Sequence, residues 1–325
     1  MRRPLVALLI ATSLALALVA LTLGPSGISI GETIGILTAG GGSASKRYII
    51  WNLRLPRIIA SSLSGAILGF SGAIFQAALR NPMADPFILG VSSGASFGVA
   101  VALALGLSAS LGFPLAALIG STATVLFILA LSSRKRTTTT LLLTGVAINY
   151  ILSAAMTLLM FMNKEQYQRI LYWSLGSFST ATYRDVVILC LALLAVALPL
   201  SLAHRSLDML LLDESSAQAL GLRVQRVRIA VLIPASIATA ICVSSFGVIG
   251  FIGLMAPHVS RLLVGPRHKN LLLPSSLFGS LLMLASDTLA RILLPSGELP
   301  VGVITSLVGV PLFIYLLRKG RYRYG

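Results

Sequence analysis

The chain has 325 residues, of which 56% are hydrophobic and only 10% are charged, and its 25 basic residues far outnumber its 9 acidic ones. A soluble domain of this length carries about a quarter charged residues, so the composition excludes an ordinary soluble protein. The basic residues lie in short clusters between apolar blocks, which is typical of loops in a helical membrane protein and not of a nucleic-acid-binding surface.

Ten apolar blocks, each near the ~20 residues that a helix needs to cross a bilayer, predict an all-α polytopic membrane protein with about ten transmembrane helices. In chain order they are 4–24, 56–78, 86–107, 114–133, 140–162, 185–203, 229–247, 248–264, 271–294 and 300–318. The first block could be a secretory leader. Its apolar run is longer than a leader core and no small-x-small site ends it, so we expect a first transmembrane helix.

Ten spans place both termini on one side of the membrane. Most basic clusters then share that side, which the positive-inside rule identifies as cytoplasmic. We therefore expect a multi-pass protein of the cytoplasmic (inner) membrane with both termini inside. The basic residues that would face outward need a separate explanation, and they are Lys46, Arg47, Arg54, Arg57, Lys164, Arg169, Arg184 and Arg291.

The stretch 71–96, SGAIFQAALRNPMADPFILGVSSGAS, interrupts the apolar character of the chain with polar and charged residues and two prolines. Exposed backbone and polar groups of this kind are not tolerated against lipid. A protein that must open a path for a solute does need such a segment, so we expect a movable element between the second and third spans.

Small residues at a spacing of four predict close helix packing, because small side chains let backbones approach each other in lipid. They are Ser61, Gly65 and Gly69 in one set, and Gly90, Gly94 and Gly98 in the other. The longest inside loop, 204–228, contains DESSAQALGL, a good helix former followed by glycine at a plausible C-cap. Its length and helical character favour a docking element over a solvated connector.

The sequence offers little for catalysis. No Gly-x4-Gly-Lys-Ser/Thr loop occurs that would hold the phosphates of a nucleotide. No Ser-His-Asp or Cys-His arrangement has suitable spacing, and Cys190 and Cys242 indicate neither a disulfide nor a metal site. Asp287 and Arg291 lie four apart and can pair on one helix face, either to neutralise two charges or to take part in docking. We expect no enzymatic activity and no cofactor or metal of the chain's own.

Seven segments in order along nearly the whole chain resemble FecCD-type permeases, the membrane subunits of ABC importers for iron–siderophore complexes, haem and cobalamin. They are RLPR at 54–57, the segment 71–95, LLLTGVAI at 141–148, YWSLGSF at 172–178, ALGL at 219–222, GFIGLMAPHVSR at 250–261 and ELPVGVITSLVGVPLF at 298–313. The resemblance implies a type II ABC importer permease fold, in a single transmembrane domain over 1–325.

The same resemblance implies partners and sites. The partners are a second permease copy, two cytoplasmic ATPase subunits that bind ATP, membrane lipid and an extracytoplasmic substrate-binding protein. The implied docking residues for that binding protein are Arg54, Arg57 and Arg291. The implied cytoplasmic gate consists of Asn81, Met83, Thr138 and Thr139. The implied coupling segment for the ATPase is about 208–228, with Ala219, Leu220, Gly221 and Leu222 at its centre.

The chain departs from the family pattern at two places. Met83 stands where leucine is usual, and the two side chains have similar volume. His268 lies in Arg-His-Lys where the family often has Asp-His-Arg, so the ion pair of that aspartate is in doubt.

The substrate is expected to be a metal chelate, with a smaller oxyanion as the alternative. A secondary transporter driven by an ion gradient would need a midplane acid, for which Asp287 is the best candidate.

Overall fold

The computed structural model describes residues 2–24, 27–109, 111–132, 137–164, 167–294 and 297–319, and within these ranges every regular element is helical. Each of the ten apolar blocks forms one helix, as predicted. These helices are α1 (Arg2–Thr22), α4 (Leu55–Ala78), α5 (Val91–Ala104), α6 (Gly112–Leu131), α7 (Thr138–Met162), α9 (Tyr183–Leu202), α12 (Val224–Phe246), α13 (Ile252–Val264), α14 (His268–Ile292) and α15 (Val301–Lys319).

The ten helices differ in length. Among the described residues, seven helical stretches are long and apolar enough to cross a membrane, whereas α5, α13 and the segment Val301–Tyr315 of α15 are shorter apolar stretches. The turn between α12 and α13 is short, as expected, and Gly247 and Phe251 adopt positive φ in it. Three block starts were wrong by four or five residues. α12 begins at Val224, five residues before its predicted block, because the charged start of this helix carries no apolar signal. α5 begins at Val91 and α13 at Ile252, five and four residues after the starts of theirs.

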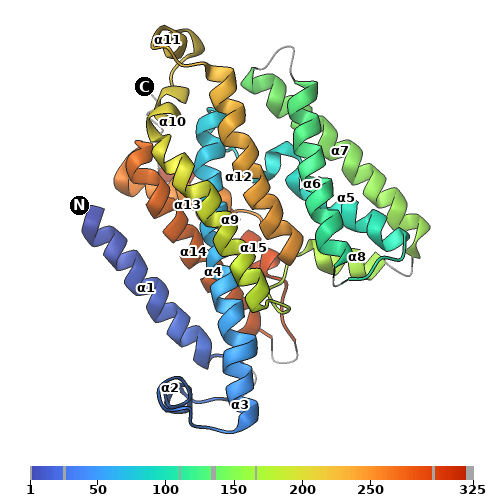
Figure 1. Ribbon diagram of the computed structural model, residues 1–325, viewed down its shortest axis with the longest axis vertical. Coiled ribbons are helices and arrows are strands. Elements are labelled where there is room, and N and C mark those ends of the chain that lie inside the picture. The colour runs from blue at the N-terminus through green and yellow to red at the C-terminus, as the bar shows by residue number, and fades with distance from the viewer. Residues whose placement is uncertain are drawn as a thin grey trace.

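Short helices mark the two ends of the bundle (Figure 1). At one end lie α2 (Ile30–Ala39) and α3 (Ala44–Tyr48), and α3 continues through the π-helical η1 (Ile49–Arg54) into α4. This continuous stretch of 35 residues is about 50 Å long at 1.5 Å per residue, well beyond a hydrocarbon core of about 30 Å. At the opposite end lie α10 (His204–Leu210) and α11 (Glu214–Ala219).

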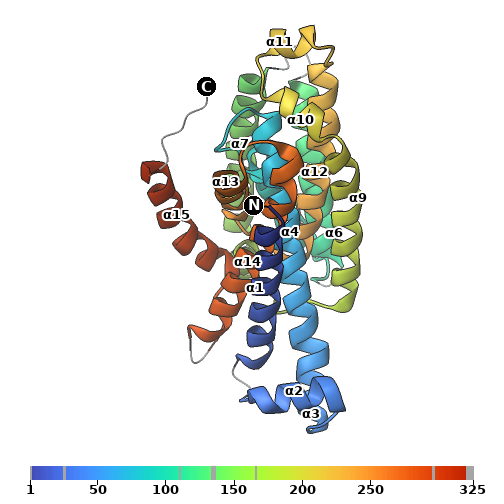
Figure 2. The ribbon, with the colours of Figure 1, turned by 90° about the vertical axis from the view of Figure 1, so that its left-hand side faces the viewer.

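The bundle has two parts. Helices α5, α6 and α7 form one group with the short α8 (Tyr167–Ser174), and α12 packs against this group and against α4. The other part is built around α4, whose neighbours are α13, α14, α9 and α12. Figure 2 shows α1 and α15 flanking α14 on the outside of this second part. Helix α4 is the most enclosed of the predicted spans.

Glycines set the contacts of α4. A Cβ atom at Gly65 would collide with the carbonyl oxygen of Gly279 on α14, and one at Gly72 would collide with that of Gly253 on α13. At Gly69 the obstacle is the carbonyl of Ser275. The predicted packing role of Gly65 and Gly69 is therefore confirmed, and the helices touch backbone to backbone.

The second glycine set behaves in two ways. Gly94 and Gly98 pack against α6, where an added Cβ would meet the carbonyls of Gly120 and Ala116, so their predicted packing role is also confirmed. Gly90 also packs against α6, where an added Cβ would meet the Thr124 side chain, and in addition it has φ of 83° and precedes α5 as its N-cap, after the 3-10 turn η2 (Pro86–Leu89). Its conformation is the left-handed one that glycine adopts without steric cost.

Replacing Gly72 by alanine should destabilise the protein by about 1–3 kcal/mol, because the added methyl group overpacks a backbone contact that cannot relax. Gly31→Ala is the matched control, since a Cβ at Gly31 on α2 has no neighbour within 4 Å. The measurement is the thermal midpoint of each purified variant in detergent. A Gly72→Ala midpoint equal to that of Gly31→Ala would contradict the packing described above.

Candidate functional site

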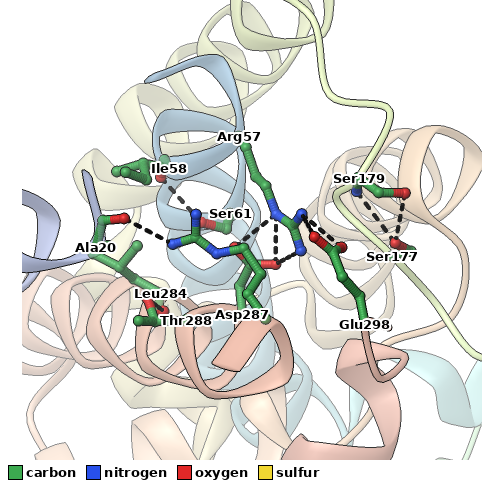
Figure 3. A network of polar contacts seen from close by, with 11 residues as sticks. Ala20, Arg57, Ile58, Ser61, Ser177, Ser179, Leu284, Asp287, Thr288 and Glu298 are labelled. Atoms are coloured by element: carbon green, nitrogen blue, oxygen red, sulfur yellow. Dashed lines mark hydrogen bonds and ion pairs between the residues drawn. The ribbon is translucent and has the colours of Figure 1, made fainter. Parts of the chain in front are cut away.

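A cluster of charged residues lies near the start of α4, which follows α3 and η1 in the chain, and Figure 3 shows this cluster from close by. The guanidinium of Arg57 donates from Nε to both carboxylate oxygens of Asp287 at 3.0 Å, and from Nη2 to Oδ1 at 2.8 Å. Its Nη1 contacts Oε2 of Glu298 at 2.8 Å. Asp287, on α14, is fully buried, whereas the Glu298 side chain, before α15, is 37% exposed. The planar fork of arginine suits this double carboxylate contact.

Two further arginines of the cluster cap helix α1. Arg291 donates from Nη2 to the carbonyl of Ala20 at 3.1 Å, and Arg54 donates from Nη1 to the carbonyl of Leu21. Both carbonyls lie in the last turn of α1, where backbone acceptors lack partners within the helix. The predicted Asp287–Arg291 pair is present at 3.8 Å, but Arg57 is the closer partner of Asp287.

The structure therefore brings all three predicted docking residues together in one place. Arg54, Arg57 and Arg291 are only 5%, 8% and 5% exposed, and each contacts groups of its own chain. Glu298 is the partly exposed carboxylate of the cluster. Sequence reasoning missed the role of Glu298, because it lies 241 positions from Arg57 and carries no local signal of the contact.

At the other end of α4, the loop 79–85 forms a tight hydrogen-bonded turn. The Asn81 side chain accepts a hydrogen bond from the Met83 backbone N–H at 2.9 Å, and the Asn81 carbonyl accepts from Ala84 at 3.0 Å. This side-chain pattern is the one with which asparagine stabilises turns. Met83 is 42% exposed at the tip of the turn. Asn81 therefore shapes the loop, and Met83 projects from it.

Gln76, one of the polar residues in the interrupted stretch, joins α4 to α13. It is 2% exposed, donates from Nε2 to the Leu254 carbonyl at 3.3 Å and accepts from Arg261 at 2.8 Å. Both ends of its amide are thus bonded within the bundle, as a buried polar side chain requires.

Thr138 and Thr139 lie in the first turn of α7, with Thr138 half-buried and Thr139 exposed. The preceding Thr137 caps the helix by accepting a hydrogen bond from the Thr140 N–H at 3.2 Å. Among the described residues, no hydrogen bond joins Thr138 or Thr139 to Asn81 or Met83. The contact of α7 with this region is made farther along, where Asn149 and Gly145 approach the Ile88 carbonyl.

The predicted short helix in the loop 204–228 is α11. Asp213 caps it, accepting hydrogen bonds from the Ser215 hydroxyl at 2.5 Å and the Ser216 N–H at 2.9 Å, and these lower the pKa of Asp213 to about 2. Gly221 has φ of 85°, and the Leu222 N–H donates to the Ala217 carbonyl at 3.0 Å. This is a Schellman ending, so the predicted glycine C-cap is confirmed.

The end of α11 projects from the bundle. Leu220 is 63% exposed, Ala219 and Gly221 are also exposed, and Leu222 is half-buried. An exposed leucine on a tightly capped helix gives a partner protein an apolar contact in a fixed position. The four residues predicted to couple to an ATPase thus lie together on an accessible surface at the α10–α11 end (Figure 1).

His268 contacts Asp208, whereas position 267, where the family often has aspartate, is arginine in this chain. Its backbone N–H and its Nδ1 contact the same carboxylate oxygen of Asp208, on α10, at 2.8 and 2.7 Å. Partial burial opposes ionisation of Asp208, but the hydrogen bonds from the side chain and backbone of His268 outweigh it and lower the pKa. This contact joins α10 to the start of α14.

Comparison with known proteins gives a consistent result. The model of the FecCD transport family matches residues 7–319. The uncharacterised ABC transporter permease protein YvrB of Bacillus subtilis is 40% identical over 281 residues, which cover 84% of this chain and 80% of YvrB. The cobalamin import system permease protein BtuC of Halobacterium salinarum is 39% identical over 280 residues, 85% of this chain and 75% of BtuC.

A solved structure has the same fold over its full length. It is a metal-chelate type ABC transporter in an inward-facing conformation, and it superposes with a TM-score of 0.88 and 30% identity over 98% of this chain and 100% of that chain. The family model spans the charged cluster around Arg57, the loop 79–85 and the α10–α11 segment, all of which lie within residues 7–319. The chain therefore belongs to the FecCD transport family.

Proposed function

We propose that the chain is the membrane-spanning permease subunit of an ABC importer that moves a metal chelate, such as cobalamin, an iron–siderophore complex or haem, across the cytoplasmic membrane. The observation that carries this proposal is the match of residues 7–319 to the FecCD family, together with the likeness of the chain to a metal-chelate transporter. Relatives named as cobalamin permeases support cobalamin as a substrate.

In this proposal residues 1–325 act as one permease domain with both termini in the cytoplasm. Two copies form the pathway between them, and two separate ATPase subunits bind and hydrolyse ATP, so the chain itself makes no covalent bonds. An extracytoplasmic binding protein delivers the chelate. The gate would consist of Asn81 and Met83 in the loop after α4, with Thr138 and Thr139 at the start of α7.

The geometry disfavours a transporter driven by an ion gradient. Its best candidate, Asp287, is fully buried and holds contacts of 3.0 Å or less with Arg57. A carboxylate paired in this way cannot readily take up a proton or Na⁺, because doing so would leave the buried guanidinium of Arg57 with Glu298, which is partly exposed, as its remaining carboxylate. A smaller oxyanion remains the alternative substrate on the same fold.

The charged cluster around Arg57 supports a docking mode in which a carboxylate of the binding protein replaces one of the chain's own carboxylates. A carboxylate of the binding protein would reach Arg57 by displacing Glu298, which is partly exposed, while Asp287 stays in place. The exposed tip of α11, Ala219–Leu222, would dock on the ATPase.

The direct test is uptake into sealed vesicles that contain the assembled transporter. Cobalamin, a ferric siderophore and haem are offered in turn, with the binding protein outside and ATP inside, and no ion gradient is imposed. We expect accumulation of one of them, and none without ATP. Uptake driven by an imposed proton or Na⁺ gradient alone would contradict the proposal.

Replacing both Arg54 and Arg57 by glutamate should abolish stimulation of ATPase activity by the binding protein, because the docking carboxylates would then meet like charges. Lys46→Glu is the matched control, since Lys46 is a partly exposed cation at the same end, paired with Glu32. The measurement is ATPase rate with and without binding protein, with the thermal midpoint confirming that the variant is folded. Full stimulation in a folded double variant would reject docking at this cluster.

Replacing Ala219–Leu222 with bulky charged residues should prevent the ATPase from co-purifying with the permease, because the apolar contact of Leu220 and the glycine cap are both lost. The same kind of substitution at Ile30 and Ile34, exposed on α2 at the far end, is the control. A stoichiometric complex retained by the 219–222 variant would show that the ATPase docks elsewhere.

A further inference from the structure

A fully buried arginine joins the exposed α11 to the end of α4. Arg228, in the second turn of α12, is 0% exposed. Its Nη2 pairs with the Glu214 carboxylate at 2.8 Å, and its Nε donates to the Ala78 carbonyl at 3.1 Å. Glu214 is the first residue of α11 and Ala78 is the last of α4. One guanidinium thus spans from the coupling segment to the residue before the loop 79–85.

A second arginine makes the same kind of link from the loop itself. Arg80 donates from Nε to the carbonyl of Leu210, the last residue of α10, at 2.8 Å. Its φ of 47° is a left-handed conformation that residues other than glycine seldom adopt. Its Nη2 is buried and has no hydrogen-bond partner among the described residues. The surroundings thus hold Arg80 in a conformation that its own chemistry does not favour.

The two links act on neighbouring positions. Ala78 and Arg80 flank the start of the loop, and Asn81 follows directly, with its N–H bonded to the Gln76 carbonyl at 3.1 Å. On the other side, both links end on the α10–α11 segment, which Asp208 also ties to the start of α14. A displacement of α10–α11 must therefore carry the start of the loop with it or break both contacts.

We propose that Arg80 and Arg228 are positioning residues that transmit movement of the α10–α11 segment to the loop 79–85. The inference rests on the proposed function, in which an ATPase displaces α10–α11 and the loop carries the gate. The alternative is that each arginine only donates a hydrogen bond to a helix-end carbonyl and stabilises the fold. The two differ in whether loss of a link uncouples ATP hydrolysis from transport in a folded protein.

Arg80→Gly is the sharpest variant. Glycine adopts positive φ without cost, so the backbone is kept while the bond to Leu210 is removed. Arg80→Lys is the conservative control, because it keeps a charged donor near that carbonyl. In vesicles containing the assembled transporter and supplied with cobalamin, we expect Arg80→Gly to keep basal ATPase activity and to transport about tenfold less per ATP hydrolysed, as expected for one charged hydrogen bond.

Arg80→Lys should restore the amount transported per ATP hydrolysed toward that of the unaltered protein. Arg228→Lys, which cannot span both contacts of Arg228, should lower this ratio in a protein whose thermal midpoint shows that it is still folded. An unchanged ratio in Arg80→Gly would overturn the inference. Absence of ATP-driven uptake of cobalamin, a ferric siderophore and haem alike by the unaltered transporter would instead defeat the proposed function.

A second measurement judges the link without any transport. Amide hydrogen exchange of the isolated chain in detergent should be about tenfold faster over 79–85 in Arg80→Gly than in Arg80→Lys, with the exchange of α7 unchanged as an internal control. Equal exchange of the loop in the two variants would show that Arg80 does not hold it to α10, whatever the uptake assay gives.

Discussion

Direct backbone contact between α4 and its neighbours α13 and α14 is the constraint on which the rest of the structure depends. Lipid tails are as apolar as the side chains, so the hydrophobic effect does not drive helices together within a membrane. Helices there associate through close packing and hydrogen bonds. Gly65 and Gly72 remove the side chains that would keep the backbones apart. This close approach places Arg57 against Asp287 at one end of α4 and Gln76 against Leu254 at the other.

Arginine side chains donate hydrogen bonds to the carbonyls at helix ends that lie within the bundle. Four of them each donate to a carbonyl in the last turn of a helix, where acceptors have no partner within the helix. The pairs are Arg54 with Leu21, Arg291 with Ala20, Arg228 with Ala78, and Arg80 with Leu210. A positive charge at this position also opposes the negative end of the helix dipole. These four basic residues thus have a structural use within the bundle.

Features that depend on neighbours in sequence could be predicted, and contacts between distant segments could not. The Gly221 cap, the packing of Gly94 and the Asp287–Arg291 pair follow from spacings of a few residues. The contact of Arg57 with Asp287 joins positions 230 apart, and that of Asp208 with His268 joins positions 60 apart. No local pattern marks such partners, because tertiary packing alone brings them together. The gate assignment of Thr138 and Thr139 rests on resemblance and stays a prediction.

If Arg80 and Arg228 tie the α10–α11 segment to the loop 79–85, the segment and the loop move as one body in the proposed two-copy transporter. Spin labels at Leu211 and Met83 of one copy, both at exposed positions, report the distance between segment and loop. This distance should be the same with and without ATP, whereas the distance between Met83 labels on the two copies, measured in a second sample, should change. A Leu211–Met83 distance that changes with ATP while the Met83–Met83 distance stays fixed would show that segment and loop move independently.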